Sequence, residues 1–240
     1  MNRNSNTYQI LYSAIMVIVV GAVLAFVYME LKPKQDENRA NDTRSQILSA
    51  IHVAPQEGQV GEAFNKYIVK QYLVDAQGNV TDSSANVAFN VDMKANVKLP
   101  AAQRKLPVLV SRLDDGSMKY VIPMYGAGLW GPIWGYVAVD ADGNTVYGAN
   151  FSHESETPGL GARIAEQPFQ DEFKGKHLYA GGAFKSVAVM KKGQKTPSGG
   201  EQVDALSGAT ITSRGVSTML NDCLAPYDPF FKKLQGKTAK

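Results

Sequence analysis

The pattern of apolar and polar residues divides the chain into one long apolar run near its start and a longer part in which short apolar segments alternate with turns. Residues 10–29 carry no charge. A helix of that length spans about 30 Å, the thickness of a bilayer's hydrocarbon core. A bulky stretch over 26–30 stands where a signal peptide would have a small-residue cleavage site. We therefore predict an uncleaved transmembrane anchor over 10–30, preceded by a short tail over 1–9.

The charges that flank this run do not decide its orientation. Arg3 precedes the run, whereas Lys32, Lys34, Arg39 and Arg44 follow it. This count of basic residues favours a cytoplasmic location for the rest of the chain, but long domains translocate largely regardless of charge. Both orientations stay open on this basis.

The segments after the anchor are short, and most of them favour strands. The polar stretch 32–42 reads as a linker before a helix over 43–53, and a further short helix is expected near 62–65. Strands are expected at 67–74, 86–93, 106–113, 118–122, 133–139, 145–151 and 184–190, with turns at 75–79, 114–117 and 140–144. Because strands outnumber helices and tight turns join them, we predict an α+β domain with antiparallel sheet.

The last third of the chain predicts two helices. One is short, over 168–173. The other covers 212–224, with its apolar residues on one face and Pro226 just beyond its end. A polar loop over 191–200 precedes it, and a C-terminal tail is expected over 226–240.

Composition excludes several classes of function. The 240 residues carry a net charge of +3, without a basic stretch interleaved with aromatic residues, so nucleic-acid binding is not expected. The single cysteine, Cys223, cannot form an internal disulfide. His52, His153 and His177 lie far apart without the spacing of zinc ligands, so no metal site is predicted.

Two glycine-containing segments resemble known binding motifs, but the neighbouring sequence does not fit either motif. Residues 126–131 fit the G-x-G-x-x-G pattern, but Pro132 and a strand follow where a dinucleotide site needs a helix. The segment instead reads as a loop that exposes Leu129 and Trp130, either to cover a planar ring or to fill a cleft. Residues 140–144 resemble the start of a calcium loop, but glycine comes fourth rather than sixth, so we predict a plain turn.

Two later segments are candidates for chemistry. Over 153–161, a polar loop with Pro158 and two glycines is either a surface loop or a backbone ledge against a flat ligand, with Glu156 and Thr157 as hydrogen-bonding groups. Over 204–210, small residues precede a helix start, where unpaired N–H groups favour a phosphate that Thr210 could esterify. An ordinary helix cap explains the same pattern.

A hydrolase is the competing chemical interpretation of these segments. It would use Ser207 as nucleophile and His153 as base. The G-x-S-x-G elbow that usually presents such a serine is absent from the sequence, which disfavours this interpretation.

Together the segments resemble one family. The Asp-x-x-Ser-Gly-Ala-Thr run over 204–210 resembles the sequence that a flavin transferase recognises when it attaches FMN to threonine. The run over 156–161 resembles a second signature of the same FMN-binding domain. With the N-terminal anchor, the chain is similar to the C-subunit family of bacterial sodium-translocating NADH:quinone oxidoreductases. The G-subunit of the Rnf complex shares both motifs, but the long stretch before Gly126 favours the C-subunit family.

The resemblance implies a covalent cofactor and a location. FMN would be bound through its phosphate to Thr210, with Asp204 and the run Ser207, Gly208 and Ala209 guiding the transferase. The domain would face the periplasm from the inner membrane, against the count of basic residues. The FMN-binding core would cover 126–225, after a linker and a membrane-proximal α+β region over 31–125.

A bound FMN also implies roles for individual residues. Glu156, Thr157, Leu160 and Gly161 would line one side of the flavin, with Leu129 and Trp130 near the other. Thr212, Ser213 and the helix N-terminus would contact the phosphate, whose charge Lys191 or Lys192 would offset.

The expected activity follows from what the sequence lacks as well as from the flavin. The sequence contains no recognisable motif for a nicotinamide site, an iron–sulfur ligand set or a quinone pocket. No catalytic residue is expected. The chain is therefore expected to relay electrons between other subunits of a membrane redox complex. The alternative is a membrane-tethered FMN-binding regulatory module.

Overall fold

The computed structural model describes residues 5–56 and 58–238, and these form two compact units that divide after Thr43. Arg3 and the rest of 1–4 in the predicted N-terminal tail lie outside the described residues, as do 239–240 of the predicted C-terminal tail.

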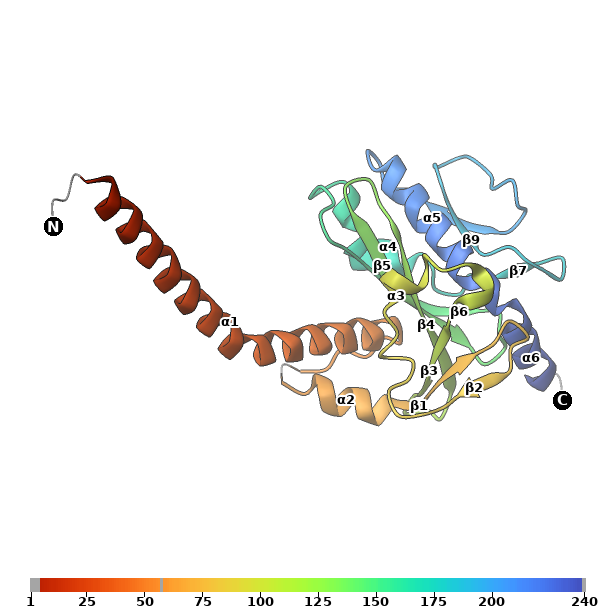
Figure 1. Cartoon of the computed structure of the whole chain (residues 1–240). Helices are drawn as coiled ribbons and strands as arrows, with labels where there is room; N and C mark the ends of the chain where they lie inside the picture. Colours follow the sequence, from red (N-terminus) through yellow and green to blue (C-terminus); the bar gives the residue numbers. More distant parts are fainter. Residues whose placement is uncertain (1–4, 57, 239–240) are drawn as a thin grey trace. The chain divides into compact units, whose positions relative to one another are not determined.

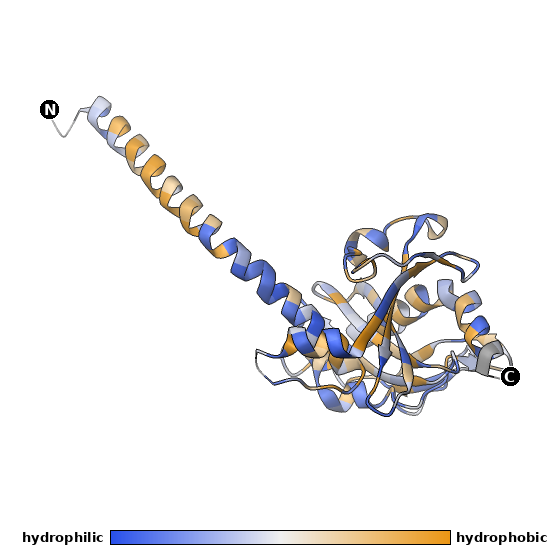
Figure 2. Ribbon diagram, turned by 90° about the horizontal axis from the view of Figure 1, so that it is seen from below, coloured by the Kyte–Doolittle hydropathy of each residue, from blue (hydrophilic) through white to orange (hydrophobic). Residues whose placement is uncertain are grey.

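The first unit is the greater part of helix α1 (Asn6–Ala50), which is long and apolar enough to cross a membrane. Its apolar first half gives way to a polar second half (Figure 2). The linker predicted over 32–42 is wrong, because the helix continues through it and through Pro33. Lysine, glutamate, glutamine and arginine are good helix formers, and Lys32 pairs with Asp36 one turn later at 3.3 Å.

The second unit is built on a six-stranded sheet in the order β2-β1-β3-β4-β5-β6, in which every neighbouring pair is antiparallel (Figure 1). The strands are β1 (Ile68–Val74), β2 (Val80–Asp82), β3 (Leu106–Arg112), β4 (Met118–Ala127), β5 (Pro132–Asp140) and β6 (Val146–His153). This confirms the predicted α+β class with antiparallel sheet.

The β5–β6 hairpin shows why the 140–144 segment is a turn. One carboxylate oxygen of Asp142 accepts hydrogen bonds from the backbone N–H groups of Asn144 and Thr145, each at 2.9 Å. The other oxygen accepts from the Thr145 hydroxyl at 2.6 Å. The acidic side chain thus closes the turn itself.

The strand predicted over 86–93 is wrong, because most of this segment forms turns and only Met93 enters helix α3 (Met93–Asn96). Asn86 has a φ of 59°, which no strand allows. The N–H of Phe89 is bound by the Gln71 side chain at 2.9 Å rather than by a neighbouring strand.

Other elements follow the predictions more closely. Helices α2 (Val60–Tyr67), α4 (Gln167–Asp171) and α5 (Thr210–Leu224) lie where helices were expected. The predicted strand over 184–190 is two short strands, β8 (Ala183–Phe184) and β9 (Val187–Met190). Strand β9 pairs in parallel with β10 (Glu201–Asp204), and β7 (Tyr179–Ala180) pairs with β8. Single 3-10 turns η1, η2 and η3 cover Ala101–Gln103, Gly161–Ala165 and Ala225–Tyr227.

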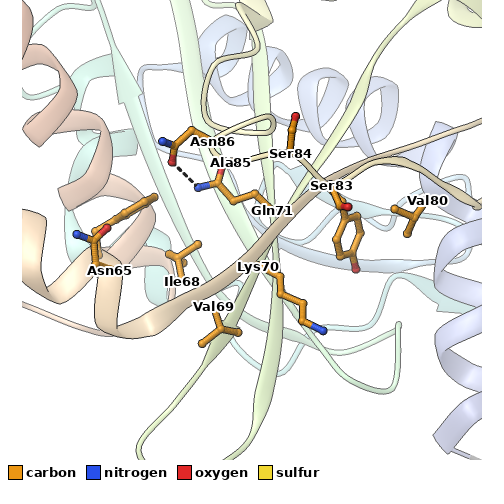
Figure 3. A pocket seen from close by; sticks show the side chains of 12 residues that line it. Asn65, Ile68, Val69, Lys70, Gln71, Val80, Ser83, Ser84, Ala85 and Asn86 are labelled. Carbon is orange, nitrogen blue, oxygen red and sulfur yellow. Dashed lines mark hydrogen bonds between the residues drawn. The ribbon is translucent and has the colours of Figure 1, made fainter.

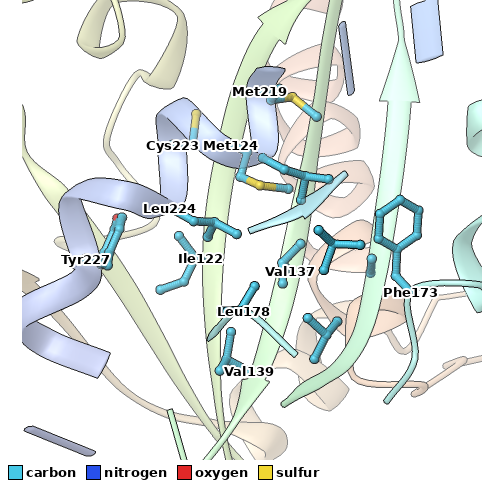
Figure 4. Close-up of a cluster of buried hydrophobic side chains, with 14 of the residues drawn as sticks. Ile122, Met124, Val137, Val139, Phe173, Leu178, Met219, Cys223, Leu224 and Tyr227 are labelled. Atoms are coloured by element: carbon cyan, nitrogen blue, oxygen red, sulfur yellow. The ribbon is translucent and has the colours of Figure 1, made fainter. Parts of the chain in front are cut away.

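The sheet buries apolar side chains on both faces, since successive residues of a strand point to opposite sides. Ile122 packs in a cluster with Met219 and Leu224 of α5 (Figure 4). Its neighbour Val121 packs in a second cluster with the end of α1, including Leu48. The sheet therefore lies between α5 on one side and the end of α1 on the other.

The chain after Pro226 is not a tail as far as the structure describes it, and that prediction is wrong. It forms helix α6 (Asp228–Thr238), whose side chains Phe230, Phe231 and Leu234 are buried in the cluster that holds α5. Their spacing places them on one face of the helix, and burying them stabilises the fold by roughly 1.5–3 kcal/mol each.

Candidate functional site

Three segments far apart in the sequence meet around the side chain of Glu156. Its Oε1 accepts hydrogen bonds from the backbone N–H groups of Leu129 and Trp130, at 2.8 and 2.9 Å. Its Oε2 accepts from the Thr212 hydroxyl at 2.5 Å. These contacts, which we call the Glu156 cluster, join the β4–β5 loop, the loop after β6 and the first turn of α5.

The Glu156 carboxylate is held in its charged form. The side chain is only 4% exposed. Burial by itself raises the pKa of this carboxyl, but hydrogen bonds from Thr212, Trp130 and Leu129 outweigh it and lower the pKa below its ordinary value of 4.5. Thr212 belongs to the first turn of α5, whose partial positive charge also favours a carboxylate.

Glycines allow the three segments to approach this closely. A Cβ on Gly128 would collide with Oε1 of Glu156, and a Cβ on Gly161 would collide with Oε2. Gly208 has a φ of +76°, and a Cβ there would come within 2.8 Å of the Leu160 side chain. Close contact with the cluster therefore explains Gly128 and Gly161, and contact with Leu160 explains Gly208.

The first turn of α5 presents backbone donors and a hydroxyl. Ala209 occupies the N-cap position without a capping side chain. The first N–H groups of a helix have no acceptor within the helix, and those of Thr210 and Ile211 gain no other acceptor among the described residues. The Thr210 side chain is exposed at the same point. This turn therefore offers an anion both N–H donors and an adjacent hydroxyl.

An apolar patch surrounds this turn. Its four side chains, Leu129, Trp130, Leu160 and Ile211, are 45%, 67%, 42% and 54% exposed. They come from the same three segments that the Glu156 cluster joins. The patch is suited to a planar apolar group attached near Thr210.

The predicted residues Glu156, Thr212 and Ser213 are brought together, but their side chains are not presented to a ligand. Thr212 and Ser213 are each 1% exposed. The Ser213 hydroxyl accepts from the N–H of Leu206 at 3.1 Å and so fixes the loop before the helix. These three side chains are buried and hold the segments of the site in place.

The remaining predicted residues lie in the loop after β6 or at the ends of β9 and β10. The Thr157 side chain is exposed, and its carbonyl accepts from the N–H groups of Leu160 and Ala162. Asp204 ends β10, and its N–H donates to Oε2 of Glu172. Lys191 and Lys192 are exposed directly after β9, whose end is paired with the end of β10.

The hydrolase pairing is not formed. In the described chain no hydrogen bond joins Ser207 to His153, and Nδ1 of His153 accepts instead from the N–H of Glu156 at 3.2 Å. His153 is therefore a support for the Glu156 loop.

A groove of about 400 Å³ runs along α5 from the patch, with Gly128, Ile211, Arg214 and Gly215 among its lining residues. A Cβ on Gly215 would collide with the carbonyl oxygen of Ala127, so this glycine lets the end of β4 reach the helix. Arg214 and Gly215 were not predicted from the sequence as site residues. The spacing of four residues between Thr210 and Arg214 could have indicated that Arg214 belongs to the site.

A separate hollow of about 630 Å³ lies beside β1 and is lined by Asn65, Lys70, Gln71 and Asn86 among others (Figure 3). None of its lining residues belongs to the three segments around Thr210. Its lining residues include neither a helix N-terminus nor any of the predicted site residues, so we place the candidate site at Thr210.

The site fits a phosphorylated planar cofactor such as FMN. The turn at Thr210 offers donors for a phosphate, the patch offers an apolar surface for a ring, and the glycines leave room at the backbone. The family model for the FMN-binding domain matches residues 128–225, which include all of these features.

Similarity to known proteins extends beyond that domain. The C-subunit of the Na(+)-translocating NADH-quinone reductase of Vibrio anguillarum is 31% identical, over 91% of both chains. The crystal structure of the same subunit from Parabacteroides distasonis is 43% identical, has a TM-score of 0.76 and covers 84% of this chain and 96% of its own. NqrC of Shewanella oneidensis is 31% identical, with a TM-score of 0.67, over 83% of this chain and 99% of its own. The chain therefore belongs to the NqrC family, the C-subunits of the Na(+)-translocating NADH-quinone reductases.

Proposed function

We propose that this protein holds FMN bound covalently through its phosphate to Oγ1 of Thr210, and that it relays electrons within a Na(+)-translocating NADH-quinone reductase. The observation that carries the proposal is the exposed Thr210 hydroxyl among unpaired N–H groups, beside the apolar patch. Bound FMN supplies redox chemistry in one- and two-electron steps.

Attachment forms one phosphoester bond. The Thr210 hydroxyl would give its proton to a base of the catalyst and attack the phosphorus of an activated flavin nucleotide; the phosphorus–oxygen bond to the leaving group would break, and the leaving group would depart with that oxygen and the bonding electron pair. A flavin transferase is the proposed catalyst, because the turn provides the acceptor and N–H donors, while both oxygens of the nearby Glu156 carboxylate already accept hydrogen bonds. The exposed residues Ser207 and Gly208, with Asp204 before them, are the segment proposed to guide that enzyme.

Once FMN is attached, the protein's own residues orient it. The N–H groups of Thr210 and Ile211 bind the phosphate, while Leu129, Trp130 and Leu160 cover apolar parts of the ring and exclude water from it. Thr157 and Gly161 lie at its edge. The Glu156 cluster holds these segments at fixed positions, which a relay needs because electron transfer depends on distance.

The location completes the proposal. Helix α1 anchors the protein in the bacterial inner membrane beside the other subunits, and the FMN-binding domain faces the periplasm. Protease added to spheroplasts should digest the domain, whereas digestion only in inverted vesicles would overturn this orientation.

In-gel fluorescence tests the attachment. The full chain produced with a flavin transferase should fluoresce after denaturing electrophoresis, and the chain produced without it should not. Thr210→Ala should abolish the signal, because the acceptor oxygen is lost. Thr218→Ala removes another exposed threonine of α5 and should keep it. Persistent fluorescence in Thr210→Ala, or none in the unmodified chain, would refute the proposal.

A further inference from the structure

Arg214 lies four residues after Thr210 in α5, and both side chains are exposed. Residues four apart lie on the same face of a helix, and long helical side chains slope toward the N-terminus. A side chain at position 214 is therefore placed to reach the turn that carries the Thr210 hydroxyl.

The guanidinium of Arg214 is not engaged by the protein. Within the described ranges it makes no hydrogen bond or ion pair. Arg104, which lines the same groove, donates instead to the carbonyl oxygens of Leu99 at 2.9 Å and Val97 at 2.7 Å. Arg214 is thus available to a ligand, whereas Arg104 is fixed in a structural role.

The carboxylates near Arg214 do not compete for it. Asp222 lines the same groove but lies eight positions further along α5, about 12 Å along the helix axis. Glu156 is buried, and both its oxygens are bound within the Glu156 cluster. In the part of the chain that the structure describes, the end of the groove at Ile211 and Gly128 therefore combines a helix N-terminus with one free cation.

From this arrangement we propose that Arg214 pairs with the phosphate carried by Thr210 and positions it at the first turn of α5. The proposal rests on the proposed function. A phosphodiester keeps one negative charge and two non-bridging oxygens, and the planar fork of arginine can donate to both of them. Arg214, rather than Lys191 or Lys192, then offsets the charge.

The test uses four full-length proteins, which are the unmodified chain, Arg214→Gln, Arg214→Lys and the control Lys192→Gln. Each is compared with and without flavin attached. Thermal unfolding is followed by circular dichroism, and flavin content by in-gel fluorescence. Unflavinylated Arg214→Gln should unfold as the unmodified chain does, because Arg214 has no partner to lose among the described residues. Flavinylated Arg214→Gln should show a folded-to-unfolded ratio about three- to tenfold lower than flavinylated unmodified chain. Arg214→Lys should recover part of this loss, and Lys192→Gln should show none.

The salt dependence of stability distinguishes a charge pair from a merely structural role. The difference between unmodified and Arg214→Gln flavinylated chains should shrink between 0.05 and 1 M NaCl (roughly 14 to 3 Å in Debye length), because the pair is exposed. If Arg214→Gln is not flavinylated, the comparison uses Arg214→Lys, which keeps the charge but not the fork.

Two results separate this inference from the proposed function. If the unmodified chain fluoresces but flavinylation stabilises the Arg214 variants as much as it does the unmodified chain, the role of Arg214 is overturned and the attachment stands. The same holds if Lys192→Gln alone loses stabilisation. If the unmodified chain does not fluoresce, both fail.

Discussion

Glu156 offers the sharpest test of how the site is held together. Replacing it with glutamine keeps the shape of the side chain but removes the charge. One oxygen remains to accept from the N–H groups of Leu129 and Trp130, and the new amide faces the Thr212 hydroxyl, which can turn to accept from it. Three charge-assisted hydrogen bonds become three neutral ones.

The magnitude follows from these three bonds. A hydrogen bond to a charged group contributes about 1.5–3 kcal/mol and a neutral one about 0.5–1.5, while removal of the charge also relieves its burial. We therefore expect Glu156→Gln to lower the free energy of unfolding by about 1–2 kcal/mol at pH 7. Glu156→Ala leaves all three donors without this acceptor and should lower it by about 2–4 kcal/mol, since the donors at the exposed loop can regain water.

The loss in Glu156→Gln should depend on pH in one direction. The pKa of the folded Glu156 carboxyl lies below its ordinary value of 4.5, so the folded state binds this proton less tightly than the unfolded chain does. The charged carboxylate therefore stabilises the fold fully above that value, and the stabilisation is lost as pH falls through the lowered pKa. The difference between unmodified and Glu156→Gln chains should be constant from pH 8 to 6 and should shrink below about pH 4.5.

Thermal unfolding in detergent, followed by circular dichroism, measures these differences. A change of 1 kcal/mol corresponds to about 2–4 °C for a domain of this size. Glu154→Gln is the matched control, because Glu154 is exposed in the same loop. Equal stability of Glu156→Gln and unmodified chain at pH 7, or a difference that does not change between pH 6 and 3.5, would refute the reasoning.

Two further predictions concern the close packing of the site and the boundary of the domain. Gly161→Ala places a Cβ against the Glu156 and Thr212 oxygens and should lower the free energy of unfolding by about 1–3 kcal/mol. The control Gly61→Ala in α2 meets open space and should be neutral or slightly stabilising, so equal effects of the two variants in unfolding experiments would contradict the packing. Removal of residues 1–43 should leave a folded domain. Removal of 1–53 also deletes the buried Ile47, Leu48 and Ile51 and should lower the free energy of unfolding by about 5 kcal/mol or more, so a folded domain seen by circular dichroism after this longer deletion would count against the prediction.

The strands and α5 could be predicted from the sequence because local pattern and tertiary packing agree there. The β5–β6 hairpin has apolar segments on either side of a turn that its own Asp142 closes. In α5, the apolar face that includes Val216 and Leu220 is the face that is buried. At these positions the local signal is also the signal that the core uses.

Other segments could not be predicted because distant contacts decide them. Residues 86–93 have the alternating pattern of a strand, but the side chain of Gln71 in β1 accepts a hydrogen bond from the N–H of Phe89. Helix α6 begins at Asp228, two residues after Pro226, which in the sequence indicates the end of the preceding helix. Only the packing of the core shows why Phe231 is buried.

The site shows the same division. The segment at Thr210 and the loop at Glu156 could be singled out from the sequence, since their motifs are local, and the Thr212–Glu156 hydrogen bond joins them in the structure; attachment at Thr210 stays a prediction. That Glu156 binds backbone donors of the β4–β5 loop rather than a ligand could not be predicted, because the pairing depends on how the sheet and α5 pack together.

The Glu156 cluster also has a consequence for the order of events when the protein is made. Its contacts join residues 27 and 56 positions apart in the chain. Such contacts form only after the sheet has closed its hairpins and α5 has docked, because long loops must be ordered first. A nascent or partly folded chain therefore contains Thr210, the proposed acceptor, without the geometry around it. Maturation by a transferase that requires this geometry would report on folding, and only correctly folded chains would receive the cofactor.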